Sequence, residues 1–476
     1  MSKGSIRSGE AAILGNATEL RTPPSKVEKI NEARRLRYSL QDQARLVLWD
    51  ADARKNSKGY QVQHRTCTCN RLSISEGADI YKSKEHSKAH YGGLMRCANS
   101  RTCPVCAATI SERKGNELRL AANQREALGL KFSLLTFTAP HTQFDRLDVL
   151  KQQMLDACAA FWRGSPAKRF KEKYGIVGHI RSFEVRYGSN GWHPHFHIIV
   201  VSKRELPSTR RARGKVCLSE QSEDWIKVLE MWQSAARRSG LKAPNEHGMD
   251  LQNGTEAGEY ITKYGGDDEI LKTKKGKSVT WDMADEMTKG HIKTGKDSLS
   301  PFEILALSGN AETEEERRKY TLLFREWSKA SERLTMLKWS RGLRALFGLS
   351  KTDKSDEQIL AEQDDKADLL CHVSTKQWQY IVCNGLRAKL LELAEGKDPI
   401  RAICEFMDEH NLDHVSLKRE DEFEDLKRGY QLVEHRNTRS KISKVEKVWG
   451  ALVTETDSVV DSIPIPDERG EVCHLK

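Results

Sequence analysis

Three histidines stand at alternate positions in residues 191–200, GWHPHFHIIV, and the segment runs directly into an apolar stretch. Side chains of a β-strand point alternately to its two faces, so His193, His195 and His197 share one face of the predicted strand. Neutral imidazole is a common ligand for divalent metals. The row of imidazoles therefore favours a metal or catalytic site over the alternative, which is the polar, solvent-facing side of an edge strand.

The segment before the histidines predicts the partner strand of a β-hairpin. Residues 177–188 have a strand-like composition, and the SNG sequence at 189–191 is a hairpin turn signal. If the turn centres on its first two residues, cross-strand partners have numbers that sum to about 379, which places Glu184 opposite His195. A carboxylate beside two imidazoles suits Mn²⁺ or Mg²⁺ acting on phosphate better than a closed structural zinc. The alternative for Glu184 is a surface strand carboxylate.

The neighbouring segments predict an α+β fold with a central antiparallel sheet flanked by helices. The predicted order is a strand at 130–140, a helix at 147–164, the hairpin, a helix at 223–240, a short strand at 249–252 and a short helix at 256–266. From about residue 300 the pattern is mostly helical. The helices predicted there cover 314–350, 376–396 and 398–411.

The chain has 476 residues, which is too long for one ordinary core. Composition predicts a polar tail and basic helix over 1–58, a cysteine-rich zinc-type module over 59–115, the sheet domain over 125–275 and a helical region over 298–476. The chain has no run of about 18 apolar residues, so no transmembrane helix is predicted. The N-terminus lacks the apolar core of a signal peptide, so a cytoplasmic location with no membrane partner is expected.

The formal net charge of +11 favours a polyanionic partner, with nucleic acid first. Basic residues concentrate in 202–215, SKRELPSTRRARGK, between the histidine strand and the next predicted helix. Phosphate contacts by such side chains give salt-dependent, sequence-tolerant affinity. We expect these residues to flank the histidine face and bind DNA, the alternative being a solvated loop: Lys203, Arg204, Arg210, Arg211, Arg213 and Lys215.

A second group of candidate residues lies in EAGEYITKY, residues 256–264. Glu256, Tyr260 and Tyr264 are spaced by four, so a helix presents them on one face. A tyrosine can attack a phosphodiester and hold it as an ester, but its ordinary pKa of about 10 requires a metal or cations nearby. Lys263 could supply such a cation, and Glu256 could act as the base for a later attack. The alternative is a helix whose tyrosines pack on the sheet.

The cysteines predict a structural zinc site. RCANSRTCPVC contains Cys97, Cys103 and Cys106, and HRTCTC contains Cys67 and Cys69. A tetrahedral zinc site takes four ligands, so the first three thiolates plus Cys67 or Cys69 would close one site. A reducing cytosol favours thiols and metal ligands over disulfides. The alternative is a set of buried or merely free thiols.

Together these motifs resemble those of a known family. EVRYGSNGWHPHFHIIV resembles the histidine–hydrophobe–histidine signature of HUH endonucleases, and more narrowly that of rolling-circle replication initiators (Rep proteins) of small bacterial plasmids. FSLLTFTAPH resembles the first motif of that family. EAGEYITK resembles its nucleophile motif, with a glutamate four residues before the catalytic tyrosine and a lysine three after it. The cysteine run resembles a segment ahead of the first motif, and the resemblance is close over about 95–270.

The resemblance implies a function and roles for the residues. His195 and His197, with Glu184, would hold catalytic Mn²⁺ or Mg²⁺, Tyr260 would be the nucleophile, and Glu256 would serve the terminating step. The protein would be a bacterial, cytoplasmic single-strand endonuclease and strand transferase. It would nick plasmid origin DNA, form a 5′-phosphotyrosyl intermediate and rejoin strands at termination. The implied partners are origin DNA, single-stranded at the nick site, a host helicase and replication machinery, and a second copy of the chain as a homodimer.

Two residues depart from the family pattern. Glu259 stands before Tyr260, where a lysine is expected, and Tyr264 creates a Tyr-x3-Tyr pair typical of two-tyrosine initiators and related transposases. An HUH transposase is therefore one alternative. A non-catalytic zinc-dependent DNA-binding regulator is another, although it leaves the histidine row and the tyrosines without a role. A metal-dependent oxygenase would use the histidine pair but explains neither the charge nor the tyrosines.

Overall fold

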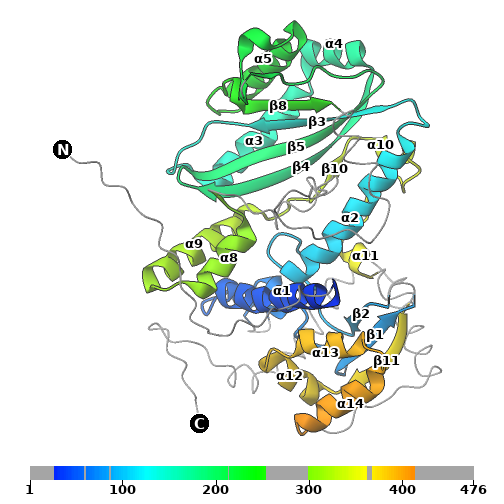
Figure 1. Cartoon of the computed structure of the whole chain (residues 1–476). Coiled ribbons are helices and arrows are strands. Elements are labelled where there is room, and N and C mark those ends of the chain that lie inside the picture. Colours follow the sequence, from blue (N-terminus) through cyan, green and yellow to red (C-terminus); the bar gives the residue numbers. More distant parts are fainter. Residues whose placement is uncertain are drawn as a thin grey trace, which may run out of the picture.

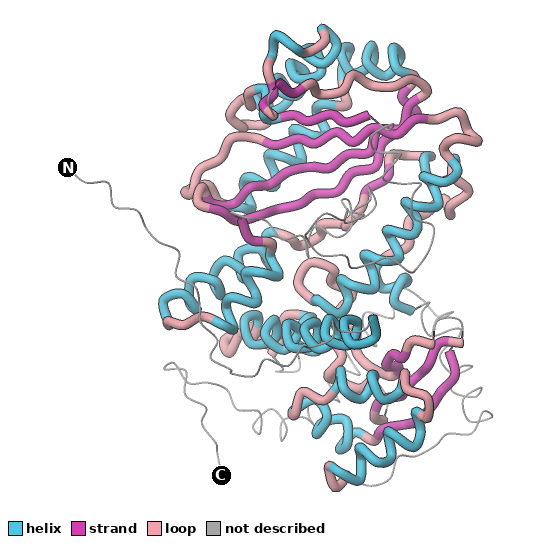
Figure 2. The backbone as a smooth tube through the Cα atoms, in the orientation of Figure 1, coloured by secondary structure: helices cyan, strands magenta, loops and turns pink. Residues whose placement is uncertain are grey.

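The computed structural model describes residues 26–57, 61–74, 76–84, 87–212, 214–253, 298–361 and 367–412. The predicted helix at 256–266, with Glu256, Tyr260, Lys263 and Tyr264, lies outside the described residues, as does Arg213. Among the described helices, none is long and apolar enough to cross a membrane. Figures 1 and 2 show a large sheet with helices around it, and a smaller sheet with its own helices at the other end of the molecule.

The large sheet is antiparallel, and its six described strands are in the order β10-β4-β5-β3-β8, with β9 also paired to β4 (Figure 2). Its centre is the predicted hairpin, whose two long strands close through a turn at Ser189 and Asn190. The strands are β3 (Lys131–Thr138), β4 (Ile176–Gly188), β5 (Gly191–Ser202), β8 (Met249–Asn253), β9 (Ser298–Leu299) and β10 (Lys338–Trp339). The predicted α+β class with an antiparallel sheet flanked by helices is confirmed.

One face of the large sheet is covered along its length. Phe196, Ile198 and Val200 of β5 are buried on this face in the largest core cluster. Trp225 and Trp232 of α5 belong to the same cluster, and Trp232 stacks on a phenylalanine of β3. Three of the helices that contribute to this core are α3 (Leu147–Phe161), α4 (Gly164–Tyr174) and α5 (Glu223–Arg238).

The opposite face carries an apolar core over only part of its length. Ile199 and Val201 of β5 pack there in a second cluster with Ile110 and Leu118 of α2 (Pro104–Gln124). This cluster also takes in residues of α10 (Leu343–Leu346) and α11 (Asp356–Ala361). The odd-numbered positions of β5 that precede Ile199 are the three histidines. The second core therefore ends where the histidine row begins.

Three helices link the large sheet to the smaller unit. They are α1 (Lys26–Leu48), α8 (Pro301–Asn310) and α9 (Glu314–Ala330), and Figure 1 shows α1 between the two sheets. The small sheet has the order β11-β1-β2, with β1 (Ala78–Ser83), β2 (Ala89–Gly92) and β11 (Ala367–Val373). Its helices are α12 (Thr375–Cys383), α13 (Arg387–Ala394) and α14 (Pro399–Glu409). The described C-terminal part is thus mainly helical, as predicted.

Residues from both ends of the described chain therefore build one small unit. Arg387 is fully buried and forms an ion pair with Asp42 of α1. The same guanidinium donates to Oε1 of Gln41 at 2.7 Å, and Nε2 of Gln41 donates to Sγ of Cys103 at 3.2 Å. Because β1 and β2 pair with β11, part of the cysteine-rich stretch 59–115 belongs to this unit and part packs on the large sheet.

Two of the predicted C-terminal helices are interrupted. Residues 314–350 form α9, then the short strand β10, then α10, because β10 pairs with the edge of β4 and Gly342 adopts a left-handed conformation (φ 81°). Residues 376–396 split into α12 and α13 at Asn384 and Gly385. The prediction of a single long helix at 314–350 is therefore wrong.

Candidate active site

Glu184, His195 and His197 come together on the large sheet, next to the end of the second core cluster. Glu184 lies directly opposite His195 in the β4–β5 hairpin. Oε2 of Glu184 is 3.4 Å from Nε2 of His195 and 3.3 Å from Nε2 of His197. The exposed fractions of the three residues are 8%, 8% and 5%. The three groups can therefore contact one ion at the same time.

Neighbouring groups orient both imidazoles. Thr136 of β3 is the cross-strand partner of His197, and its hydroxyl lies 3.2 Å from Nδ1 of that ring. Nδ1 of His195 lies 3.4 Å from the carbonyl oxygen of His193. Contacts of this kind at one ring nitrogen fix which nitrogen faces a ligand. In both rings the remaining nitrogen, Nε2, faces Glu184.

The charge of Glu184 is stabilised in this arrangement. Burial alone would raise the pKa of its carboxyl, but His195 and His197 hold that pKa well below its ordinary value. Both carboxylate oxygens are buried and accept no well-formed hydrogen bond among the described residues. A buried carboxylate in this situation ordinarily pairs with a cation or coordinates a metal. The residues present thus fit a divalent metal held by two imidazoles and one carboxylate.

His193, the third histidine of the row, lies beside this group. Its Nδ1 is 3.4 Å from Nδ1 of His141, which follows β3. Burial, followed by the nearby His195 and His141, lowers the pKa of His193 to about 4. The ring is therefore neutral at pH 7. It extends the histidine face toward the turn of the hairpin.

Sequence reasoning missed two polar residues on the same face, Thr136 and Asp250. Asp250 of β8 is the cross-strand partner of Thr136, so both side chains lie in one row with His197. Arg211 reaches this row from the basic loop, with Nη2 at 2.8 Å from Oδ1 of Asp250. The threonine-rich end of FSLLTFT was the available signal for Thr136. The short strand MDLQ carries no sequence pattern that indicates a role for Asp250.

The basic loop does not lie along the histidine face as a whole. Lys203 and Arg204 follow the end of β5, and their backbone N–H groups donate to carbonyls at the end of α4. His197 is five residues before the end of β5, which is a distance of roughly 17 Å along a strand. The backbone N–H and carbonyl of Arg210 are hydrogen-bonded to the side chain of Gln221. Lys215 is in the short strand β7 (Lys215–Val216), which pairs with β6 (Arg211–Ala212). Among the described residues of this loop, only Arg211 reaches the row.

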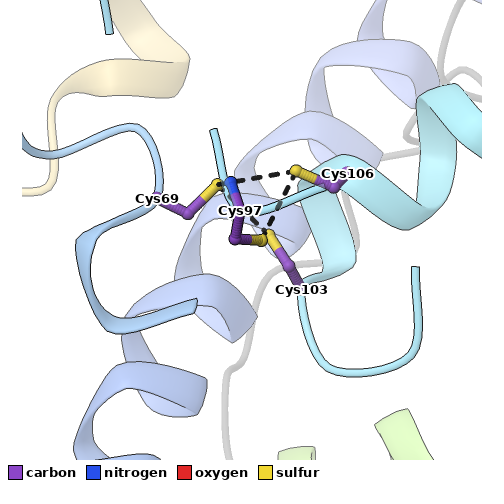
Figure 3. A group of neighbouring side chains, drawn as sticks. All are labelled: Cys69, Cys97, Cys103 and Cys106. Atoms are coloured by element: carbon purple, nitrogen blue, oxygen red, sulfur yellow. Dashed lines mark hydrogen bonds between the residues drawn. The ribbon is translucent and has the colours of Figure 1, made fainter. Parts of the chain in front are cut away.

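Four of the five predicted cysteines form a second cluster. Figure 3 shows the side chains of Cys69, Cys97, Cys103 and Cys106 converging from two loops and the start of α2. The sulfur–sulfur distances are 3.5 Å for Cys69–Cys106 and 3.7 Å for Cys97–Cys106 and Cys69–Cys103. Thiolates in tetrahedral contact with one zinc ion lie about 3.8 Å apart, given a Zn–S bond of about 2.3 Å. The cluster fits a zinc ion without rearrangement.

Cys67 is not part of this cluster. Its thiol points toward the carbonyl oxygen of Arg45 at 3.7 Å. Cys67 lies within the 3₁₀ helix Arg65–Thr68, whereas Cys69 is the extended residue that ends this helix. Of the two alternatives for the fourth ligand, the structure therefore places Cys69 with the other three. Cys67 is buried against α1 as an ordinary core residue.

The surroundings of the cluster favour a thiolate at Cys103, whereas neighbouring thiols and burial raise the pKa of Cys69 and Cys97 well above the ordinary value. The backbone N–H of Cys97 donates to Sγ of Cys69 at 3.4 Å, and the Gln41 amide donates to Sγ of Cys103. Cys103 caps the N-terminus of α2, where the helix dipole stabilises negative charge. Burial would raise the pKa of Cys103, but contacts with Cys106, Cys69 and Cys97 hold it well below its ordinary value.

Comparisons with known proteins show which proteins this chain resembles. Residues 94–244 match a family described as "Replication protein". This range includes the histidine hairpin and three of the four clustered cysteines. The match supports the predicted resemblance to plasmid replication initiators, and that resemblance is confirmed.

Two relatives are similar over parts of the chain. The first is "Protein rep" of Streptomyces lividans, 28% identical over 362 residues, covering 64% of this chain and 76% of that protein. The second is a "Neomycin resistance protein" of Streptomyces cyanogenus, 31% identical over 173 residues, covering 31% of this chain and 39% of that protein. No solved structure gives a significant match. The family match and the first relative support a role as a replication initiator.

Proposed function

We propose that this protein starts rolling-circle replication by nicking one strand of plasmid origin DNA at the histidine face of its large sheet. The observation that carries the proposal is the Glu184, His195 and His197 group, buried and oriented on that face. A divalent metal held there, Mn²⁺ or Mg²⁺, would supply Lewis-acid polarisation of the scissile phosphate. The four clustered cysteines would hold a structural zinc ion.

Tyr260 is the proposed nucleophile. Its phenolic oxygen forms a bond to phosphorus, the bond from phosphorus to the 3′ oxygen breaks, and the strand ends as a 3′-hydroxyl and a 5′-phosphotyrosyl link. The phenolic proton passes to a nearby base or to solvent. Lys263 would stabilise phenolate, and Glu256 would serve a second attack that rejoins the strands. The 3′-hydroxyl is then the primer for synthesis.

The length of chain between β8 and Tyr260 is compatible with this role. The last residue of β8, Asn253, pairs with Ser133 of β3, three residues before Thr136. From strand geometry, Asn253 is roughly 14 Å from His197, two strands and about three residues away. Tyr260 follows Asn253 by seven residues, which span at most about 25 Å when extended. Tyr264 follows Asn253 by eleven residues, so its longer connection can span this distance as well, which keeps the two-tyrosine alternative open.

Metal-dependent cleavage tests the proposal. An end-labelled single strand carrying the nick site of the parent replicon is incubated with Mn²⁺ and wild-type protein, Glu184→Gln or His197→Ala. Loss of a catalytic metal ligand should lower the cleavage rate by at least about 100-fold. Glu357→Gln, an exposed carboxylate on α11, is the matched control and should cleave like the wild type. Cleavage that is equally fast in Glu184→Gln and His197→Ala would contradict the proposed site.

A further inference from the structure

A basic groove lies along the outer edge of the large sheet, away from the histidine face. Its volume is about 610 Å³, and its walls come from β4, α3 and the segment from Arg333 to Asp353, which includes β10. Phe183 and Phe196 line it, so it opens on the face opposite to Glu184. Among the residues that the structure describes, none of those predicted to bind DNA lines this groove.

The groove carries positive charge without matching carboxylates. Asp353 already pairs with Lys114 and Arg344, and Asp156 accepts a hydrogen bond from Gln152. Five other cations line the groove and form no ion pair with a carboxylate among the described residues: Arg181, Arg333, Lys338, Arg341 and Lys351. All but Arg181 are exposed.

Two of these cations face each other directly. Lys338 of β10 is the cross-strand partner of Arg181 of β4. Like charges at directly opposed positions destabilise a strand pair. The guanidinium of Arg181 lies over the ring of Phe196 at 5.4 Å, which holds it at the groove wall. The opposed pair of Lys338 and Arg181 therefore lowers the stability of the free protein. The pair is explained if the functioning protein holds an anion between these two cations.

The groove adjoins the candidate active site at the edge of β4. Between the short strands β9 and β10, Arg101 donates to the carbonyl oxygens of Phe183 at 3.4 Å and Thr335 at 2.8 Å. Phe183 and Thr335 line the groove, and Glu184 is the next residue after Phe183. A strand held in the groove would have to pass around the edge of β4 to reach the histidine face.

We propose that this groove binds the phosphodiester backbone of the DNA that flanks the nick site. The proposal rests on the proposed function, because that function places DNA at the neighbouring face. A row of exposed cations without base-reading geometry fits phosphates, whose contacts position a strand without specifying its sequence. Single-stranded and duplex flanks present the same chemistry, and the probes below distinguish them.

The test removes the positive charges of Lys338 and Arg341, which form no ion pair among the described residues. Lys338→Gln with Arg341→Gln is compared with Arg237→Gln with Arg238→Gln, two exposed cations at the end of α5. Binding is measured without divalent metal by fluorescence anisotropy over a range of salt concentrations. The probes are a short single strand with only the nick site, the same strand with a single-stranded flank, and the same strand with a duplex flank.

The groove variant should bind the extended probes more weakly than wild type does. Two lost phosphate contacts should reduce the slope of log affinity against log salt by about 1.4 for a single-stranded flank and about 1.8 for a duplex flank. The flank whose slope falls identifies the form of DNA bound. Melting temperature should stay equal or rise, because the repulsion between Lys338 and Arg181 is relieved. Mn²⁺-dependent cleavage of the short strand should be unchanged.

The proposal is overturned if the groove variant keeps the wild-type affinity and salt slope on both extended probes, or if the α5 variant loses as much. Failure of the proposed nickase function gives a different result. In that case wild-type protein shows no metal-dependent cleavage, while the groove variant still loses affinity for flanking DNA.

Discussion

Thr136 and His197 are directly opposed on β3 and β5, and the threonine hydroxyl lies 3.2 Å from Nδ1 of the imidazole. This contact turns Nε2 of His197 toward Glu184. Thr136→Val keeps the shape of the side chain and removes the hydroxyl, so the ring loses its fixed orientation. We expect the affinity for Mn²⁺ to fall by about 10-fold, as for other residues that orient a ligand. Calorimetric titration with Mn²⁺ measures it.

Thr138→Val is the matched control for this experiment. Thr138 is the cross-strand partner of His195 on the same strand, but no hydrogen bond joins its hydroxyl to a histidine in the described part of the chain. It should bind Mn²⁺ like the wild type. Equal affinity in all three proteins would show that Thr136 does not orient the ligand.

The cysteine cluster makes a prediction about metal content and stability. Purified protein should contain one zinc ion, and Cys106→Ser should lose it together with several kcal/mol of the free energy of unfolding, about the scale of structural zinc sites. Cys67→Ala, at a buried cysteine outside the cluster, should keep its zinc. Elemental analysis and urea unfolding measure the two effects. Loss of zinc in Cys67→Ala with retention in Cys106→Ser would reverse the assignment.

Arg101 connects the cysteine cluster to the candidate active site. It lies in the loop between Cys97 and Cys103, and it donates to the carbonyl of Phe183, the residue before Glu184. Arg101→Lys loses the forked donor, so β4 is held less firmly at Glu184. We expect Mn²⁺ affinity to fall by about 3- to 10-fold with little change in melting temperature. Arg125→Lys, a buried arginine at the end of α2, should bind Mn²⁺ normally. Unchanged Mn²⁺ affinity in Arg101→Lys would show that Arg101 does not connect the cysteine cluster to the candidate active site.

His179 makes stability depend on pH. Burial, helped by Arg181 and Lys171, lowers the pKa of its imidazole from 6.5 to about 4, and the ring stacks on Trp162 at 4.3 Å. Between these pH values the unfolded chain binds a proton that the folded protein does not. The free energy of unfolding therefore falls as pH drops from about 6.5 to 4. His179→Phe keeps the stacking and should show a weaker fall in urea unfolding at a series of pH values. An identical pH profile in both proteins would contradict this.

The hairpin is the most predictable part of the molecule. A short turn fixes the register of two antiparallel strands, so the SNG turn signal is enough to place Glu184 opposite His195, and the two residues are paired in this way. The orientation of His197 by Thr136 is not predictable in the same way. It depends on β3 pairing with β5 across about sixty residues, and no local signal sets that register.

Other features depend on distant contacts as well. The choice of Cys69 over Cys67 follows from a 3₁₀ turn that places the two thiols on different sides, and their spacing alone does not reveal it. The apolar pattern of 314–350 predicts a helix, but residues 338–339 pair with the edge of β4 instead. Local helix propensity is overridden when a sheet edge offers backbone partners. The cationic pair of Lys338 and Arg181 arises from the same long-range pairing, so no local pattern indicates it.

The proposed nickase function requires that a tyrosine of this chain becomes covalently joined to DNA. The direct measurement incubates protein, Mn²⁺ and an end-labelled single strand from the origin of the parent replicon. The products are separated under denaturing conditions with and without protease. A protease-sensitive adduct that is lost in Tyr260→Phe and kept in Tyr264→Phe is the result we predict. An adduct lost only when both tyrosines are changed would indicate a two-tyrosine enzyme. If folded wild-type protein forms no adduct and cleaves no strand from a validated origin, the result would contradict the proposed nickase function.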